Sequence, residues 1–542
     1  MPVPGQELER PSSKKSPALL EIPGEESPAN NIEPPQPSLT KPAPFSQAPR
    51  VQGLTVYSKN QLDAILKTCG AKNDALSPLR SCAEALTAKL VSDGYINSIV
   101  YEQLKPDPGF LLVDEGKIVE VRVECSDPRL RKSVLSLLKS LHGSILNTLS
   151  LRRSLERLRA VEGIAFVKGS LGRLGSDPSQ ASLTVYVQPD RGALRGELGL
   201  RNDGSIGSGE FRTTGVLLKN SFIQSGDSLL IYGELDADSQ PNLGSAIGSV
   251  SYSLPLSDRF TVTGAFGFSR RNLIELPQPS NGISSSQYQG YGQMEYLIKQ
   301  SLYQRWAFTA GLSALTNNIY LNGQSALQFL PSRLARPQSG YMRFALTGNG
   351  TAGKADWLAT SYFLQGIGGA TPQEQRVDLS SIGINPSQSS ALGALVSATL
   401  NISPRSQVNL RAGGQLALQP LTSPMQFTIG SDVGLRGLPG QLISGDNGWL
   451  GVGEIAYMVW RNKNQGVQIV PFIGAGGVKT SVAGATFADT VGSGGLLFRW
   501  MASSGWAFEL GWVKQFNIET PSEIWNSWLI GDGLYTKATF RF

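Results

Sequence analysis

The sequence of 542 residues has few of the side chains on which active sites and metal centres usually depend. It contains one histidine, His142, and three cysteines, Cys69, Cys82 and Cys125. The histidine follows an apolar series at the end of a predicted helix, so we expect a capping or surface residue there. No cysteine has metal-ligand spacing with it. We therefore predict that the protein is not an enzyme, and we expect no catalytic residue, cofactor or metal.

The cysteines leave two interpretations open. Cys69 and Cys82 could form a disulfide in an oxidising compartment. They could equally be two small buried side chains on neighbouring helices.

Long runs of one residue type are also missing. No apolar run reaches the length of about eighteen residues that a membrane-spanning helix needs. This excludes transmembrane helices but not a transmembrane β-barrel, whose strands are about ten residues long and alternate in polarity. The net charge of +6 is modest and no Lys/Arg-rich block occurs, so we expect no nucleic-acid partner.

The first 48 residues are rich in Pro, Ser, Glu and Lys. Such a composition cannot bury a core and predicts a disordered or extended leader. No apolar signal-peptide core follows Met1. Residues 17–22 are the one segment of the leader that could form a short helix.

Helical and strand patterns follow the leader in two units. In residues 49–125 the predicted order is strand, helix, helix, strand, strand. Ser58 and Gln61 fit a helix N-terminus, and residues 96–100 and 110–123 are expected to be the closing strands. Residues 126–190 show a similar arrangement of two helices and two strands. At this length several domains are expected, and these patterns predict two small α+β domains.

From about residue 191 the apolar period changes to two. In residues 341–347, Tyr341, Arg343 and Thr347 alternate with apolar residues, and similar alternation recurs in many other segments. Charged inner faces on many strands cannot make a dry core, but they can line a wet lumen while the apolar faces meet lipid. We predict a membrane β-barrel of about sixteen antiparallel strands in residues 191–542. A soluble sandwich is the alternative.

A glycine-rich segment, residues 427–448, interrupts the strand pattern. Such a segment permits tight backbone folding, which predicts a loop. The following strand carries Glu454. The residues that we single out in the segment are Leu435, Arg436, Gly437 and Leu438, and then the turn residues Gly445, Asp446 and Gly448.

These residues resemble the Val-Arg-Gly-Phe/Tyr loop of the outer-membrane barrel superfamily that inserts and secretes proteins. The two α+β units resemble its POTRA domains, and a terminal aromatic strand with Phe540 and Phe542 is similar to the family signal for barrel assembly. Two POTRA units rather than five are typical of the two-partner secretion pores, also called hemolysin secretion/activation proteins. The chain is identified as a member of this branch by that resemblance.

The resemblance implies a monomeric pore in the bacterial outer membrane, surrounded by lipid and inserted by the barrel-assembly machinery. Periplasmic POTRA domains would bind a large secreted exoprotein of the hemolysin or adhesin kind, and the lumenal loop with Arg436 would gate or prime the pore. The alternatives are a barrel-insertion or protein-import relative and a passive porin.

The resemblance departs at one position. The family's acidic partner of the arginine is an Asp in the pattern Pro-Phe-x-x-x-Asp-x-Gly, but residues 471–478 carry Gly476 there. A half-buried guanidinium needs an acceptor. We expect Glu454 to supply it, with Asp432 or Glu509 as less favoured choices and the carbonyl groups of residues 474–477 as the remaining option.

Overall fold

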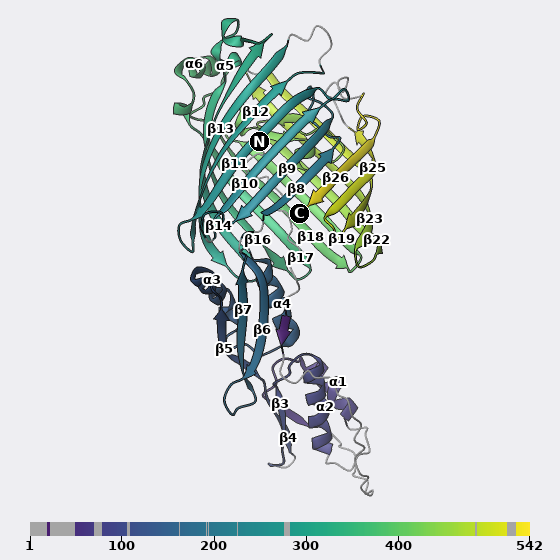
Figure 1. Cartoon of the computed structure of the whole chain (residues 1–542). Helices are drawn as coiled ribbons and strands as arrows, with labels where there is room; N and C mark the ends of the chain where they lie inside the picture. The colour runs from purple at the N-terminus through teal and green to yellow at the C-terminus, as the bar shows by residue number, and fades with distance from the viewer. Residues whose placement is uncertain are drawn as a thin grey trace. The chain divides into compact units, whose positions relative to one another are not determined.

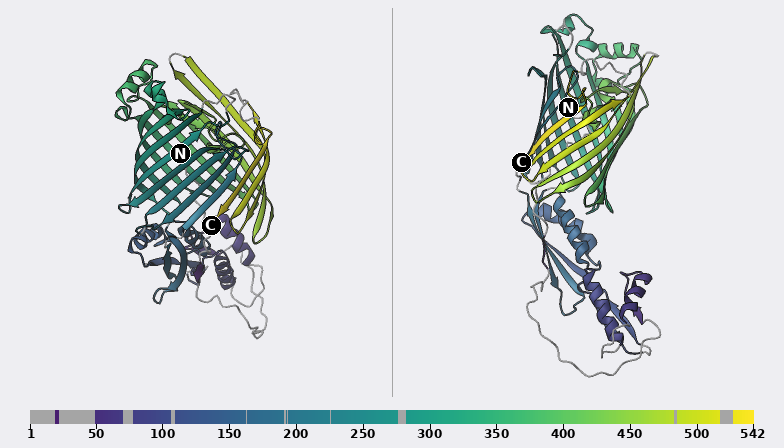
Figure 2. Two further views of the ribbon diagram at one scale, coloured as in Figure 1. Left: turned by 45° about the horizontal axis from the view of Figure 1, so that its top comes forward. Right: turned by 90° about the vertical axis from the view of Figure 1, so that its right-hand side faces the viewer.

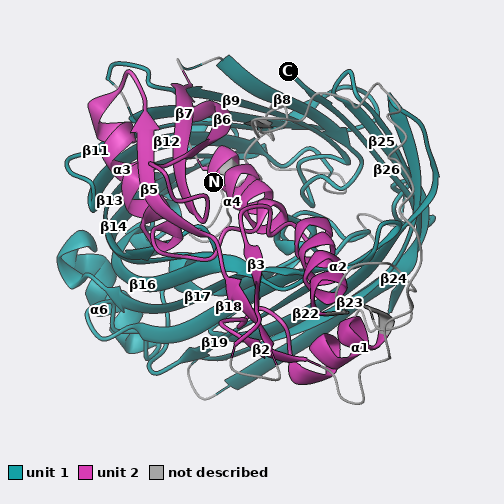
Figure 3. Ribbon diagram, turned by 90° about the horizontal axis from the view of Figure 1, so that it is seen from below, with its two compact units in different colours: residues 1–13, 192–542 teal, residues 14–191 magenta. Residues whose placement is uncertain are grey.

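The structure is a computed structural model of the whole chain. It describes residues 19–21, 49–69, 78–105, 109–161, 163–190, 192, 194–224, 226–275, 282–482, 485–516 and 527–542. The chain divides into two compact units, Lys14–Arg191 and Gly192–Phe542 with Met1–Ser13, which Figure 3 draws in different colours. Among the described residues, no helix is both long enough and apolar enough to cross a membrane.

The first sheet of the smaller unit has the order β2-β4-β3, with β2 (Arg50–Gln52), β3 (Ile99–Gln103) and β4 (Phe110–Asp114). Helices α1 (Lys59–Cys69) and α2 (Pro78–Ser92) pack on it through buried residues such as Leu86 and Leu111. The predicted cap is present, because the Ser58 amide donates to Gln61 Oε1 at 2.9 Å and the Gln61 amide donates to Ser58 Oγ at 3.4 Å.

The second sheet has the order β1-β6-β7-β5. Its strands are β1 (Leu19–Glu21), β5 (Lys117–Glu124), β6 (Ile164–Arg173) and β7 (Gln180–Pro189). Helices α3 (Pro128–Leu138) and α4 (Thr148–Ala160) begin at Asp127 and Asn147, whose side chains accept hydrogen bonds from amides of the first turn.

Two expectations for this unit were wrong. Residues 110–123 do not close the first sheet together, because β4 pairs with β3 whereas β5 pairs in parallel with β7. The Glu115 carboxylate accepts from the Val56 amide at 3.0 Å and thereby holds the turn between them on the first sheet. The chain thus changes sheet at this turn, ahead of the expected boundary at residue 125. Within residues 17–22, moreover, the described part is a strand and not a helix. The rest of the leader lies outside the described residues.

The larger unit is a closed antiparallel barrel of sixteen long strands, as predicted (Figures 1 and 2). The last strand pairs with the first and so closes the barrel. The strands are β8 (Leu194–Arg201), β9 (Phe211–Asn220), β10 (Ser228–Ala237), β11 (Leu243–Pro255), β12 (Phe260–Asn272), β13 (Ile283–Gln300), β14 (Gln304–Leu321), β16 (Gln338–Ala352), β17 (Ala355–Gly366), β18 (Ser390–Ser403), β19 (Ser406–Ala417), β22 (Asn447–Arg461), β23 (Gln465–Val482), β24 (Ala485–Ala502), β25 (Trp506–Phe516) and β26 (Leu534–Arg541).

The two faces of the barrel wall differ as the alternation predicts. On β25, Trp506, Phe508 and Trp512 are exposed on the outer face. On β16, Tyr341 and Arg343 are buried instead, and the Arg343 guanidinium lies 5.3 Å from the centre of a tyrosine ring on β17. An apolar outer face around a polar interior suits a wall that stands in lipid.

The two ends of the barrel differ in the length of their loops. At the end where β8 begins, consecutive strands are joined by short turns such as residues 353–354 and 404–405. At the other end, longer connections carry β15 (Gln324–Ser325), the helix α5 (Ser332–Ala335), the helix α6 (Gln373–Ser381) and the segment with Arg436. The predicted functional loop therefore starts from the long-loop end.

Candidate functional site: the Arg436 loop

Residues 418–446, which connect β19 to β22, are called the Arg436 loop here. At its base, β20 (Phe427–Ile429) and β21 (Ile443–Gly445) form an antiparallel pair. Near its tip, Gly434 and Gly437 have φ angles of 105° and 76°, which glycine adopts without steric cost. A Cβ atom on Gly437 would lie 2.1 Å from a side-chain carbon of Val513. The residue after Arg436 must therefore be glycine, because the tip lies directly against β25.

The loop brings its own apolar core against the barrel wall. A Cβ on Gly474 would meet the Leu435 side chain at 2.6 Å, and a Cβ on Gly476 would meet the Ile429 side chain at 2.8 Å. The glycines of β23 thus leave room for apolar loop residues, which explains why the family's aspartate is absent at position 476. The buried cluster consists of Phe427, Ile429, Leu435, Leu438, Ile443, Leu450, Val478, Val491, Trp528 and Ile530.

The guanidinium of Arg436 is held by two carboxylates. Its Nε donates to Glu454 Oε1 on β22 at 2.5 Å, and its Nη1 donates to Glu509 Oε2 on β25 at 2.8 Å. Glu509 also accepts from Arg499 Nε on β24 at 2.8 Å. All four side chains are at most one-fifth exposed. Arg436 therefore joins two parts of the wall that are separated along the barrel by β23 and β24.

Side chains of the barrel wall also bind backbone carbonyl groups at the tip of the Arg436 loop. The Ser493 hydroxyl donates to the Arg436 carbonyl oxygen at 2.6 Å, and the Gln515 side-chain amide donates to the Gly437 carbonyl oxygen at 2.7 Å. These donors satisfy carbonyl groups that a lumenal loop would otherwise leave without a protein partner.

The predicted turn at the base of the loop is tightly packed. The Asp446 amide donates to Thr480 Oγ1 at 2.9 Å, and the Asp446 carboxylate accepts from the Gln426 side chain at 2.9 Å. A Cβ on Gly448 would lie 2.3 Å from the Phe427 ring, and a Cβ on Gly445 would lie 2.9 Å from Val478. This turn anchors the hairpin of the loop to β22 and β23.

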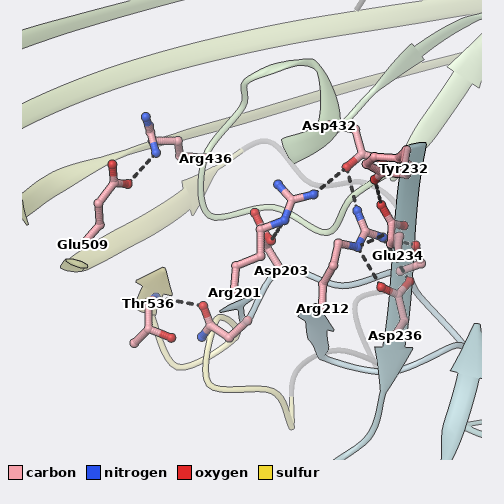
Figure 4. A network of polar contacts seen from close by, with 12 residues as sticks. Arg201, Asp203, Arg212, Tyr232, Glu234, Asp236, Asp432, Arg436, Glu509 and Thr536 are labelled. Atoms are coloured by element: carbon pink, nitrogen blue, oxygen red, sulfur yellow. Dashed lines mark hydrogen bonds and ion pairs between the residues drawn. The ribbon is translucent and has the colours of Figure 1, made fainter. Parts of the chain in front are cut away.

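Asp432, a less favoured partner in the sequence, accepts from two other arginines, Arg201 and Arg212 (Figure 4). Arg212 Nη1 on β9 lies 2.7 Å from Asp432 Oδ1, and Arg201 Nη2 at the end of β8 lies 3.1 Å from the same oxygen. Arg212 is fully buried and also donates to both carboxylate oxygens of Asp236, at 2.7 and 3.0 Å.

The C-terminal aromatic residues lie at the closure of the barrel. Phe540 pairs with Leu198 of β8, and the backbone of Phe542 exchanges two hydrogen bonds with Gly196, at 3.0 and 3.1 Å. A Cβ on Gly196 would lie 2.2 Å from the Phe542 ring, so glycine makes room for this ring. The predicted assembly signal is thus part of the seam between the first and last strands.

The cysteines are only partly described. Cys82 is disulfide-bonded and Cys125 is a free thiol. The side chain of Cys69, its predicted partner, lies outside the described residues, so this pairing stays a prediction.

Sequence reasoning missed several contributors to the site. The sequence favours Glu454 over Glu509, and no pattern in it indicates a role for Trp528 or Ile530. Arg212 and Asp236 carried a usable signal, because both are charged residues at inward positions of neighbouring strands and pair directly in register. Trp528 also donates its indole N–H to Glu275 at 2.9 Å, and burial raises the pKa of that carboxyl to about 7.

A closed barrel with an apolar outer face, an inward arginine loop and two preceding α/β units defines an outer-membrane β-barrel transporter. Residues 180–495, more than half of the chain, match the family model of haemolysin secretion/activation protein ShlB/FhaC/HecB. The chain belongs to this family of two-partner secretion pores, which confirms the resemblance seen in the sequence. No curated protein sequence matches the chain significantly.

Solved structures of similar fold include two proteins called CdiB. CdiB from Escherichia coli aligns with a TM-score of 0.59 at 16% identity, over 94% of this chain and 93% of that chain. CdiB from Acinetobacter baumannii aligns with a TM-score of 0.53 at 16% identity, over 95% and 94%. At these identities the likeness shows the fold alone.

Proposed function

We propose that this pore secretes one large exoprotein of the hemolysin or adhesin kind, and that the Arg436 loop controls its opening. In this proposal residues 49–190 lie in the periplasm and receive the unfolded client, and the protein acts as a monomer without a catalytic site. The observation that carries it is the arginine shared between Glu454 and Glu509, because it holds a loop inside the conduit that a client would have to cross.

An unfolded chain needs an aqueous route, since its backbone polar groups cannot cross lipid unsatisfied. The buried apolar cluster and the paired guanidinium keep the loop in that route. Separating this partly exposed guanidinium from its carboxylates costs about 2–4 kcal/mol, so spontaneous release of the loop is rare. Contacts made by the arriving client would have to offset that cost.

The sheet β1-β6-β7-β5 has edges that could bind an extended segment of the client before export. In the part of the chain that the structure describes, β5 pairs with a long strand, β7, on one side only. The opposite edge of the sheet, on β6, takes the leader strand β1 in parallel register, Leu19 beside Lys168. An edge that accepts one extended segment can accept another through main-chain hydrogen bonds, without demanding a particular sequence.

Deletion of residues 50–190 tests the division of labour. We expect the barrel to remain inserted, with mobility in gels that still changes on heating, while the large exported protein disappears from the culture medium. Normal secretion by the deletion variant would contradict the role of the two units. If the protein instead inserted other barrels into the membrane, removing the whole protein would deplete the cell of other outer-membrane barrels.

A further inference from the structure

Arg343 on β16 is a lumenal arginine without an acidic partner. Its side chain belongs to a residue that is 8% exposed. In the described part of the chain, no carboxylate lies within ion-pair distance of its guanidinium, and the guanidinium donates no hydrogen bond. By contrast, Arg212, Arg305 and Arg436 each bind at least one carboxylate. A nearly buried positive charge is costly to maintain alone, so this position is suited to an anion that arrives from the lumen.

The surroundings of Arg343 leave its N–H groups available to such an anion. The guanidinium carbon lies over the ring of Tyr362 on β17, 5.3 Å from the centre of the ring. Stacking of this kind uses the flat face of the guanidinium, whereas its N–H donors lie in the plane and point past the ring. Among the described residues, the fully enclosed polar atoms without a partner include none from Arg343. Its nitrogen atoms therefore still reach the lumen.

Two glycines let tyrosines pack around Arg343, on strands that are neighbours in the wall (Figure 3). Gly311 on β14 pairs in register with Arg343, and a Cβ there would lie 3.0 Å from the hydroxyl oxygen of Tyr291. On the other side, a Cβ on Gly393 of β18 would collide with the ring of Tyr362. Each glycine makes room for one tyrosine, so the guanidinium stands in a cradle that exists before any ligand binds. Such preorganisation lowers the entropic cost of binding.

The polar groups that hold the two tyrosines are neutral. The Tyr291 hydroxyl donates to Gln293 Oε1, and the Tyr362 hydroxyl donates to Gln415 Oε1 at 3.1 Å. Because glutamine carries no charge, these contacts fix the rings without compensating the charge of Arg343. One uncompensated positive charge is matched by an anion with one negative charge.

The start of the Arg436 loop shields the cradle. Leu421 and Met425 of the loop form one buried cluster with Tyr341 and Leu364 of the wall. Tyr341 lies two residues before Arg343 on the same face of β16, and Leu364 is the residue that pairs with Arg343 on β17. Apolar cover of this kind excludes water, and a charge-assisted hydrogen bond is stronger where water is excluded.

We propose that Arg343, Tyr291 and Tyr362 form a carboxylate-binding site on the lumenal wall. The planar fork of the guanidinium matches the two oxygen atoms of a carboxylate, and the single charges balance. A phosphate dianion would leave an excess of negative charge. The carboxylate has two sources, a small molecule in the lumen or an acidic side chain of a polypeptide in transit. The site requires neither movement of the Arg436 loop nor a particular client, so it goes beyond the proposed function.

Binding of acetate to the full-length protein in nanodiscs, measured by saturation-transfer NMR at constant ionic strength, tests the site. Acetate should bind saturably, whereas acetamide, which has the same shape and no charge, should not. Arg343→Gln should weaken acetate binding about tenfold or more, because charge-assisted hydrogen bonds are lost. Arg343→Lys, which keeps the charge without the fork, should retain only part of the affinity.

The matched control is Arg305→Gln, which removes the same charge from β14 but from an arginine that already pairs with Glu295. This variant should bind acetate as the wild type does. Equal acetate binding by Arg343→Gln and the wild type would overturn the proposal, as would an equal loss in Arg305→Gln. Absence of saturable acetate binding to the wild type would also overturn it, and this result needs no variant to fold.

A competition experiment distinguishes the two sources of the carboxylate. The competitors are an unstructured peptide of Gly, Ser and Glu and the same peptide with Gln in place of Glu. Displacement of acetate by the Glu peptide alone assigns the site to acidic side chains of a chain in transit, whereas no displacement assigns it to small carboxylates. A failed secretion test would count against the proposed function and not against this site, because acetate binding needs no client.

Discussion

Replacement of Arg436 by alanine should release the loop from the wall. Arg436 is one-fifth exposed and binds two carboxylates, Glu454 and Glu509. At an effective dielectric constant of about 20, one charge pair at about 4 Å contributes about 4 kcal/mol before desolvation. Partial exposure and the cost of desolvating the charges reduce this, so we expect the loop to lose about 2–4 kcal/mol of its preference for the closed position.

The two carboxylates should not respond equally. Glu509 retains Arg499 when Arg436 is removed, and no second arginine is seen at Glu454 among the described contacts. Glu454→Gln should therefore reduce the loop's preference for the closed position nearly as much as Arg436→Ala does. The reduction should not be complete, because Glu509 still binds the guanidinium. In the double variant the second change should add little, since each single change already removes the contact between Arg436 and Glu454.

Single-channel recording in planar bilayers measures the effect. A loss of about 2–4 kcal/mol corresponds to a shift of about 30- to 1,000-fold in the ratio of open to closed states. The control is Glu295→Gln, because Glu295 is another lumenal carboxylate that pairs with an arginine. This variant should leave the ratio unchanged. The proposed role of Arg436 would be refuted if Arg436→Ala had the same open probability as the wild type. It would also be refuted if the effects of Arg436→Ala and Glu454→Gln were fully additive.

Two further predictions follow from the packing of the loop. Gly476→Asp, which installs the family's usual acid, should raise the open probability rather than tighten the loop, because its Cβ would press on Ile429; longer closed times would contradict this. Burial raises the pKa of Glu275 to about 7, so its stabilising contribution is complete below about pH 4.5 and is lost as pH rises through 7. Between about pH 5 and 8 the wild type should therefore lose thermal stability relative to Glu275→Gln, and parallel Tm profiles would exclude this effect.

Local patterns in the sequence were enough to predict the barrel, the two preceding units and the arginine loop. Alternation along one strand depends only on neighbouring residues, and so does the cap formed by Ser58 and Gln61. Glu454 could be predicted as the partner of Arg436 for a similar reason, because it lies on the strand that follows the loop, eighteen residues from Arg436.

The remaining features depended on the tertiary structure. Glu509 meets Arg436 across 73 residues, and it does so because β22, β23, β24 and β25 pair in succession. Arg212 meets Asp432 across 220 residues, in a barrel whose first strand pairs with its last. The same holds for β5, whose local pattern suits either sheet and whose place was decided by β7. Periodicity specifies which face of a strand is apolar, but the neighbour that a strand pairs with, and the distant carboxylate that a lumenal arginine reaches, are set by how the strands pair in the tertiary structure.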